Sequence, residues 1–79
     1  MSDFKTRLKE LRKENRVPQK NIAEYLKVSV RAYQYYESGT IYPDFCGLIK
    51  LADYFSVSLD YLVGRSDDPE IHSKDKQQD

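Results

Sequence analysis

The 79-residue sequence contains only one cysteine, Cys46, and one histidine, His72. A single cysteine cannot form an intramolecular disulfide or a cysteine-based metal site, which fits a reducing compartment. No nucleophile with a base and no glycine-rich phosphate loop occurs. The sequence therefore predicts neither an enzyme nor a metal or cofactor site, and no small-molecule ligand is evident.

Long apolar segments are also missing. No run approaches the roughly 18 apolar residues of a membrane span, and the N-terminus lacks a signal-peptide pattern. We therefore expect a cytoplasmic chain without membrane contact. With 39% hydrophobic and 33% charged residues, the composition is that of one globular domain rather than a disordered chain.

The formal net charge of zero hides an uneven distribution along the chain. Residues 1–36 carry nine basic and four acidic side chains, a net charge of +5, whereas residues 37–65 carry −2 and residues 66–79 carry −3. The basic half suits a polyanionic partner. A solvated charged surface would have the same composition, so charge alone does not decide between the two.

Apolar residues recur at helical spacing in five segments, and no segment alternates as a strand does. The segments are 3–15, 18–27, 29–38, 44–55 and 58–64. The residues suited to cap four of them are Asp3 or Ser2 for the first, and Ser29, Asp44 and Ser58 for the third, fourth and fifth. The broadest apolar stripe, which we expect at the centre of the core, contains Phe45, Leu48, Ile49, Leu51, Ala52 and Phe55. The sequence thus predicts an all-α domain over residues 1–65, followed by a disordered acidic tail over residues 66–79.

The short segments 18–27 and 29–38 are separated by a brief turn. This spacing is typical of a helix-turn-helix, although many small helical bundles contain a similar pair. At about 100° per residue, Tyr33 and Tyr36 fall on the inner side of the second helix. The outer side carries Val30, Arg31, Gln34 and Tyr35.

These outward side chains match the edges of DNA bases. Arginine can bond guanine twice, glutamine can do the same at adenine, and valine can contact the methyl group of thymine. The same residue types are common on any exposed helix, so the pattern leaves both interpretations open.

The run from Leu8 to about residue 68 resembles the Cro/CI-type, or XRE-like, helix-turn-helix family of bacterial and phage regulators. The matching residues are Leu8, Leu11, Arg12, Gln19, Ala23, Leu26, Val28, Ser29, Glu37, Gly39 and Pro43, together with the run LIKLADYFSVSLDYLVG. The resemblance implies a five-helix, lambda-repressor-like bundle that binds double-stranded operator DNA, usually as a homodimer and most often as a repressor.

The resemblance also implies roles for single residues. The positions that face bases are Val30, Arg31 and Tyr35, with Gln34 nearby. Arg12 and Glu37 are expected to form an ion pair that fixes the helix at 29–38. Gln19 matches the family's phosphate-binding glutamine at the start of the helix at 18–27. Beyond the resemblance, we also expect phosphate contacts from Lys20, Lys27, Ser29, Thr40 and Tyr42.

The sequence departs from the family at two turns and after residue 38. Arg16 and Lys27 stand where the family often has glycine, so each requires a left-handed backbone or a rearranged turn. Relatives often have basic residues after the second helix, and this chain does not. We therefore expect fewer phosphate contacts there and a shallower salt dependence of DNA binding.

Dimerisation is expected through the exposed parts of the last helix and the turn before it, at Val57, Tyr61, Leu62 and Val63. The rival hypothesis is a protein-interaction or antitoxin-like module with weak or no specific DNA binding. The acidic tail favours this alternative.

Overall fold

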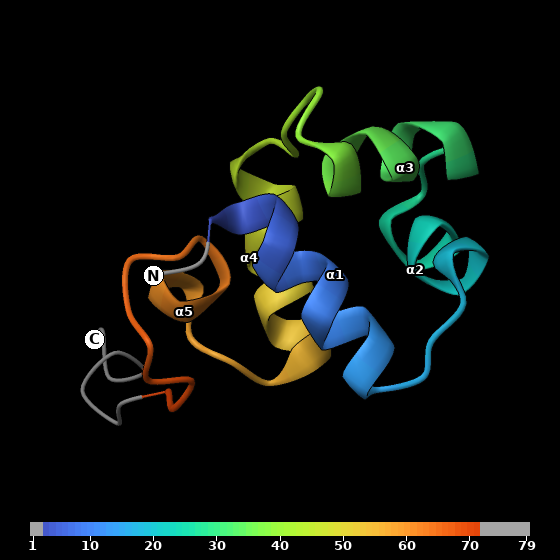
Figure 1. Cartoon of the computed structure of the whole chain (residues 1–79). Coiled ribbons are helices and arrows are strands. Elements are labelled where there is room, and N and C mark those ends of the chain that lie inside the picture. Colours follow the sequence, from blue (N-terminus) through green and yellow to red (C-terminus); the bar gives the residue numbers. More distant parts are fainter. Residues whose placement is uncertain (1–2, 72–79) are drawn as a thin grey trace.

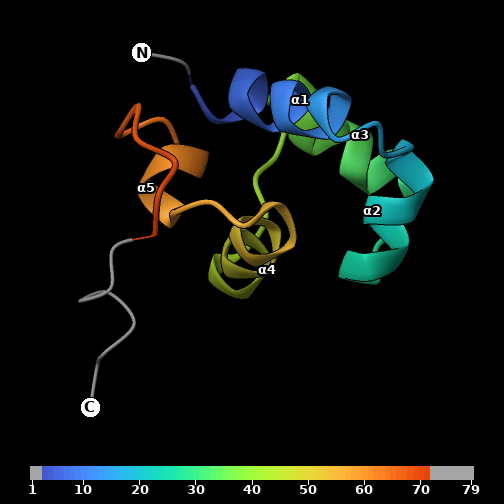
Figure 2. The same ribbon diagram turned by 90° about the horizontal axis from the view of Figure 1, so that it is seen from below.

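The computed structural model describes residues 3–71, and these form five α-helices without a strand (Figure 1). The helices are α1 (Phe4–Glu14), α2 (Gln19–Leu26), α3 (Val30–Ser38), α4 (Phe45–Phe55) and α5 (Leu59–Leu62). The predicted all-α, five-helix fold is confirmed. α1 and α3 lie together on one side of the molecule and α4 lies on the other (Figure 2).

The helices begin where local hydrogen bonding predicts. The side chains of Asp3, Ser29, Asp44 and Ser58 each accept a hydrogen bond from a backbone N–H three residues later, at 2.8 to 3.1 Å. α2 differs, since its N-cap is Pro18 and no side chain caps it. α5 is shorter than predicted: it ends at Leu62, with Val63 as its C-cap, rather than at Gly64.

One fully buried side chain from each helix meets in the core. These five are Leu8, Ile22, Tyr33, Leu51 and Leu62. Burial of a large apolar side chain contributes about 1.5 to 3 kcal/mol. Tyr36 is also buried, so the inward orientation predicted for Tyr33 and Tyr36 is confirmed.

The apolar stripe of α4 is narrower than predicted. Leu51, Ala52 and Phe55 are buried, but Phe45 is 67% exposed and Ile49 is 38% exposed. Phe45 and Ile49 are four residues apart and share a face that turns away from the core. The expectation that the whole stripe packs inward was therefore wrong for these two residues.

The residues expected at a dimer interface pack largely against the hydrophobic core of the domain. Val57 and Leu62 are 7% and 0% exposed, and Tyr61 and Val63 are partly buried against the core. The expectation that these residues are exposed was therefore wrong for Val57 and Leu62, whereas Tyr61 and Val63 keep part of their surface exposed. The short α5 must use its apolar side chains to close the core against α1 and α4, which leaves few for a partner.

Arg7 attaches the segment after α5 to α1. This arginine is only 5% exposed, and its guanidinium lies 3.7 Å from the centre of the Tyr61 ring. It donates to the carbonyl of Tyr61 at 2.9 Å and forms an ion pair with Asp67 at 3.3 Å.

The segment after α5 is also bonded to the start of α5. The N–H of Ser58 donates to the carbonyl of Pro69 at 2.9 Å. Residues 66–71, which the sequence assigned to a tail, thus contact the domain, and the remaining tail with His72 lies outside the described residues.

No helix within residues 3–71 has the length and apolar character needed to cross a membrane. The same residues contain no group of histidine, cysteine or acidic side chains that could hold a metal ion.

Candidate nucleic-acid interface

α2, α3 and the turn between them form a helix-turn-helix. Lys27 ends α2 in the left-handed conformation, with φ of 61°. Val28 continues the turn by donating its N–H to the carbonyl of Ala23 at 3.0 Å, and Ser29 caps α3. Arg16, in the turn before α2, also has a positive φ of 56°. Of the two conformations considered for Arg16 and Lys27, the structure shows the left-handed one.

The outer side of α3 carries the four predicted base-reading residues. Val30, Arg31, Gln34 and Tyr35 are all exposed, on the side of the helix opposite the buried Tyr33 and Tyr36. Nη1 of Arg31 donates to the hydroxyl of Tyr35, one turn further on, at 3.4 Å. The arrangement presents a cation, a phenol, an amide and an apolar side chain on one surface.

Arg12 of α1 holds α3 through Glu37. Nε and Nη2 of Arg12 donate to the two carboxylate oxygens of Glu37 at 2.5 and 3.2 Å, which confirms the predicted contact. The hydroxyl of Tyr33 donates to the same carboxylate at 2.6 Å. Burial would raise the pKa of Glu37, but the hydrogen bonds from Arg12, Tyr33 and Gln19 together lower it below its ordinary value. Glu37 is therefore ionised and fully bonded although it is only 6% exposed.

The ionised Glu37 also fixes the orientation of two glutamines. Nε2 of Gln19 donates to Glu37 at 3.1 Å, and Oε1 of Gln19 accepts from Nε2 of Gln34 at 3.1 Å. Because a carboxylate can only accept, Gln19 must turn its nitrogen to Glu37, and Gln34 must then turn its nitrogen to Gln19. The oxygen and second N–H of Gln34 are left for a partner.

The predicted phosphate contacts fall into two groups on either side of α3. Lys20 and Ser29 line a hollow of about 380 Å³ between α2 and the start of α3, and Lys27 is exposed at the turn. Thr40 and Tyr42 follow the end of α3. Oγ1 of Thr40 is hydrogen-bonded to the hydroxyl of Ser38 at 2.7 Å, and the 66% exposed Tyr42 packs on Phe4.

Three lysines that the sequence did not assign to a site also border this surface. Lys5, Lys9 and Lys13 of α1 line hollows beside the last turn of α3. Their spacing of four residues was visible in the sequence. What the sequence could not show is which side of α1 faces α3.

Known proteins with a similar sequence share this domain. Residues 8–62 match the helix-turn-helix family model. The chain is 40% identical over 60 residues to the uncharacterised HTH-type transcriptional regulator YqaE of Bacillus subtilis, covering 76% of this chain and 52% of YqaE. It is 38% identical over 62 residues to the cryptic phage CTXphi transcriptional repressor RstR of Vibrio cholerae, covering 78% of this chain and 55% of RstR.

A solved structure is also similar. The crystal structure of a transcriptional regulator from Listeria innocua superposes with a TM-score of 0.78 at 40% sequence identity, over 95% of this chain and 70% of that one. The fold and the α2–α3 surface define a helix-turn-helix protein. The chain belongs to the Cro/CI-type helix-turn-helix family of DNA-binding transcriptional regulators, which is not a family of enzymes. It spans about half the length of the curated relatives that it matches.

Proposed function

We propose that this chain binds double-stranded DNA in a sequence-specific manner, with α3 in the major groove, and acts as a repressor. The observation that carries the proposal is the outer side of α3, where Arg31, Gln34 and Tyr35 are exposed on a helix that Arg12 and Glu37 fix to α1. The phage repressor among the relatives supports the repressor role. A bacterial or phage operator would place the protein in the cytoplasm.

Sequence preference would come from the exposed side chains of α3. Arg31 can donate two hydrogen bonds to O6 and N7 of guanine, Gln34 can pair with adenine, and Val30 can contact a thymine methyl. The hydroxyl of Tyr35 lies 3.4 Å from Arg31 and would limit the orientations of the guanidinium. We therefore assign the main base contact to Arg31.

Affinity would come from groups that contact phosphates on both sides of α3. The first N–H groups of α2 have no side-chain cap, and a helix N-terminus attracts anions. Gln19 and Lys20 are the first two residues of α2, Lys27 lies at the opposite end of that helix, and Ser29 caps α3. Thr40 and Tyr42 lie beyond the other end of α3. Such contacts fix the register of the protein on the duplex and carry no base preference themselves.

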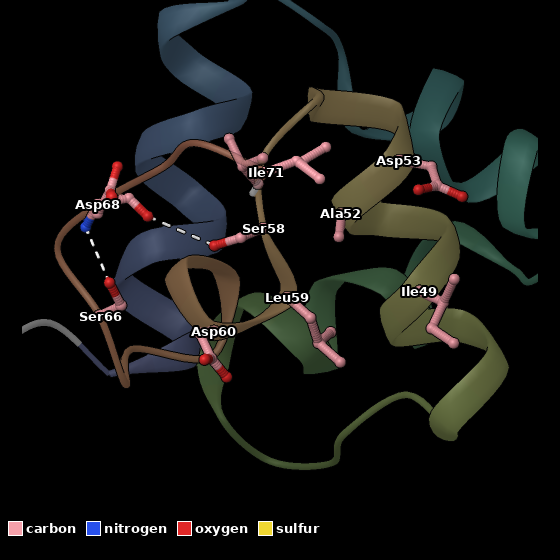
Figure 3. Close-up of a pocket in the computed structure, with 10 residues that line it drawn as sticks. Ile49, Ala52, Asp53, Ser58, Leu59, Asp60, Ser66, Asp68 and Ile71 are labelled. Carbon is pink, nitrogen blue, oxygen red and sulfur yellow. Dashed lines mark hydrogen bonds between the residues drawn. The ribbon is translucent and has the colours of Figure 1, made fainter. Parts of the chain in front are cut away.

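We also propose that the protein is a homodimer, which would place two recognition helices about 34 Å apart on a palindromic site. The dimer surface differs from the one expected from the sequence. Exposed or half-buried apolar side chains of Ile49, Leu59 and Ile71 surround a hollow of about 350 Å³ between α4, α5 and the C-terminal segment (Figure 3). Apolar side chains gathered at one surface suit contact with a second copy.

Selection of bound sequences from random DNA tests the proposed function. The wild type should enrich one motif, and Arg31→Ala should weaken binding to that motif by about 1 to 3 kcal/mol and relax the preference at one base pair while the fold stays intact. Circular dichroism checks the fold. If the wild type enriches no motif, or if Arg31→Ala keeps the full preference, base reading by α3 is wrong. Absence of a motif would favour the protein-interaction module instead.

A further inference from the structure

One exposed side of α1 carries three lysines in a row. Lys5, Lys9 and Lys13 are four residues apart, which places them on the same face of the helix at intervals of about 6 Å along its axis. All three are exposed. Among residues 3–71, the ion pairs are formed by other cations, namely Arg7, Arg12 and Arg65. The three ammonium groups therefore remain available to an external anion.

These lysines line a groove between α1 and the end of α3. Two hollows of about 330 Å³ each share Lys9, Lys13, Glu37 and Ser38 as lining residues, so they lie next to each other. One hollow extends to Lys5 and the other to Gln19 and Gln34. We call the combined feature the α1–α3 groove.

Lys5 lies across the end of α3. A Cβ atom added to Gly39, the C-cap of α3, would lie only 2.7 Å from Cδ of Lys5. The first lysine of the row is thus held beside the exposed end of the recognition helix. The groove consequently runs along the edge of the surface that we assign to DNA.

The acidic residues of the groove do not cancel its positive charge. Glu37 is paired with Arg12, and the exposed fraction of Glu37 is only 6%. Glu10 lines the same hollow as Lys5 but lies 3.8 Å from Arg7, a residue buried on the side of α5. Three lysines therefore face one exposed acid that already has a partner.

We propose that the α1–α3 groove binds phosphates of the DNA backbone next to the bases read by α3. The regularly spaced lysines beside the recognition helix suit the regularly spaced phosphate charges of a DNA strand. Each phosphate that a lysine neutralises releases counterions, which favours binding. The inference rests on DNA binding by α3 and adds a backbone contact made by α1. It also changes the salt dependence expected from the sequence, because the lysines of α1 compensate for the missing basic residues after α3.

The test compares two double variants with the same change of net charge. Lys9→Gln with Lys13→Gln removes two cations from the groove. The control, Lys50→Gln with Arg65→Gln, removes two cations from α4 and from the segment after α5, on other parts of the molecule. The affinity of each protein for the selected DNA sequence is measured between 50 and 200 mM salt.

The slope of log K against log salt should become shallower by about 1.8 in the groove variant, because each lost phosphate contact removes about 0.9. Over this fourfold range of salt, the wild type should lose about twelvefold more affinity than the groove variant. The control should keep the wild-type slope. A third variant, Lys9→Arg with Lys13→Arg, should also keep it because the charges remain.

Two outcomes would overturn the inference. If the groove variant keeps the wild-type slope, or if the control loses as much slope, the lysines of α1 do not contact phosphates, although base selection by α3 could still hold. If no protein binds DNA, the proposed function fails together with the groove. The groove variant should enrich the same DNA motif as the wild type, because its lysines contact the backbone and not the bases. A thermal melt checks that the variant is folded.

Discussion

Tyr33, Tyr35 and Tyr36 lie within one turn of α3 but have different surroundings. Tyr33 is fully buried, with its hydroxyl bonded to Glu37, and its ring packs edge-on against Tyr36 at 6.1 Å between centroids. Tyr36 is 9% exposed, whereas Tyr35 is 37% exposed and touches Arg31. Two of the tyrosines therefore belong to the core and one to the DNA-binding surface.

This difference predicts opposite effects of two alanine substitutions. Tyr36→Ala should lower the free energy of unfolding by about 3 to 5 kcal/mol, because it removes a large buried ring and leaves a cavity. Tyr35→Ala should change stability by less than about 0.5 kcal/mol, as is usual at an exposed position, but should weaken binding to the selected DNA. Urea denaturation and DNA titration of both variants check this. Equal losses of stability would contradict the assignment of the two side chains.

At the residue scale, helical periodicity was sufficient to separate the tyrosines, because 100° per residue fixes which side chains share a face. It was insufficient for Phe45 and Ile49 of α4. Periodicity identifies the apolar side of a helix, but the width of the side that neighbours cover depends on the positions of the other helices. Both residues lie at the margin of the stripe, and the structure leaves them exposed.

At the scale of elements, one buried ion pair joins α1 to α3 in addition to their packing in the core. Arg12 is 15% exposed and Glu37 is 5% exposed in their side chains, and Arg12 also donates to the carbonyl of Val17 in the turn before α2. The pair thus joins α1, α3 and the start of α2. Hydrogen bonds from Glu37 through Gln19 to Gln34 extend it to the DNA-binding surface.

Glu37→Gln should therefore destabilise the domain by about 3 to 5 kcal/mol near pH 7, because it leaves the buried side of Arg12 without a counter-charge. The pKa of Glu37 is lowered in the folded state. The advantage of the wild type over the variant should thus be full above the unfolded pKa of glutamate and should disappear as the pH falls through the lower, folded pKa.

Urea denaturation of both proteins at several pH values checks this dependence. Glu10→Gln serves as the matched control, since Glu10 is 53% exposed and lies 3.8 Å from Arg7, which keeps Asp67 as an ion-pair partner at 3.3 Å. A stability difference between wild type and Glu37→Gln that persists unchanged in acid would show that the charge of Glu37 does not stabilise the fold.

The starts of α1, α3, α4 and α5 could be predicted from the sequence because each has a cap whose hydrogen bond joins residues three positions apart. The Arg12–Glu37 pair was expected only from the family resemblance. The Gln19–Gln34 bond and the α1–α3 groove could not be predicted, because each requires knowing which faces of separate helices meet. The end of α5 was also missed: Val63 has a backbone that leaves the helix, although no proline or glycine precedes it.

At the scale of the whole molecule, basic and acidic side chains are equal in number but gather in two different regions. The residues of α1, α2 and α3 carry most of the basic side chains, whereas the acidic side chains Asp53, Asp60 and Asp68 line the hollow between α4, α5 and the C-terminal segment. Salt should therefore act on the two regions differently. Screening weakens attraction between the basic region and DNA, and it weakens repulsion between two acidic surfaces.

The proposed dimer surface is tested by a charge placed at its apolar margin. Ile49→Lys should shift the sedimentation of the DNA-free protein toward the monomer, because a lysine in an apolar contact must lose its hydration. Ile41→Lys is the control, since Ile41 has a similar exposure of 42% but does not line the hollow. Raising the salt concentration should favour the wild-type dimer by screening its acidic residues. A wild type that sediments as a monomer at every salt concentration, or an equal effect of both substitutions, would contradict dimerisation through this surface.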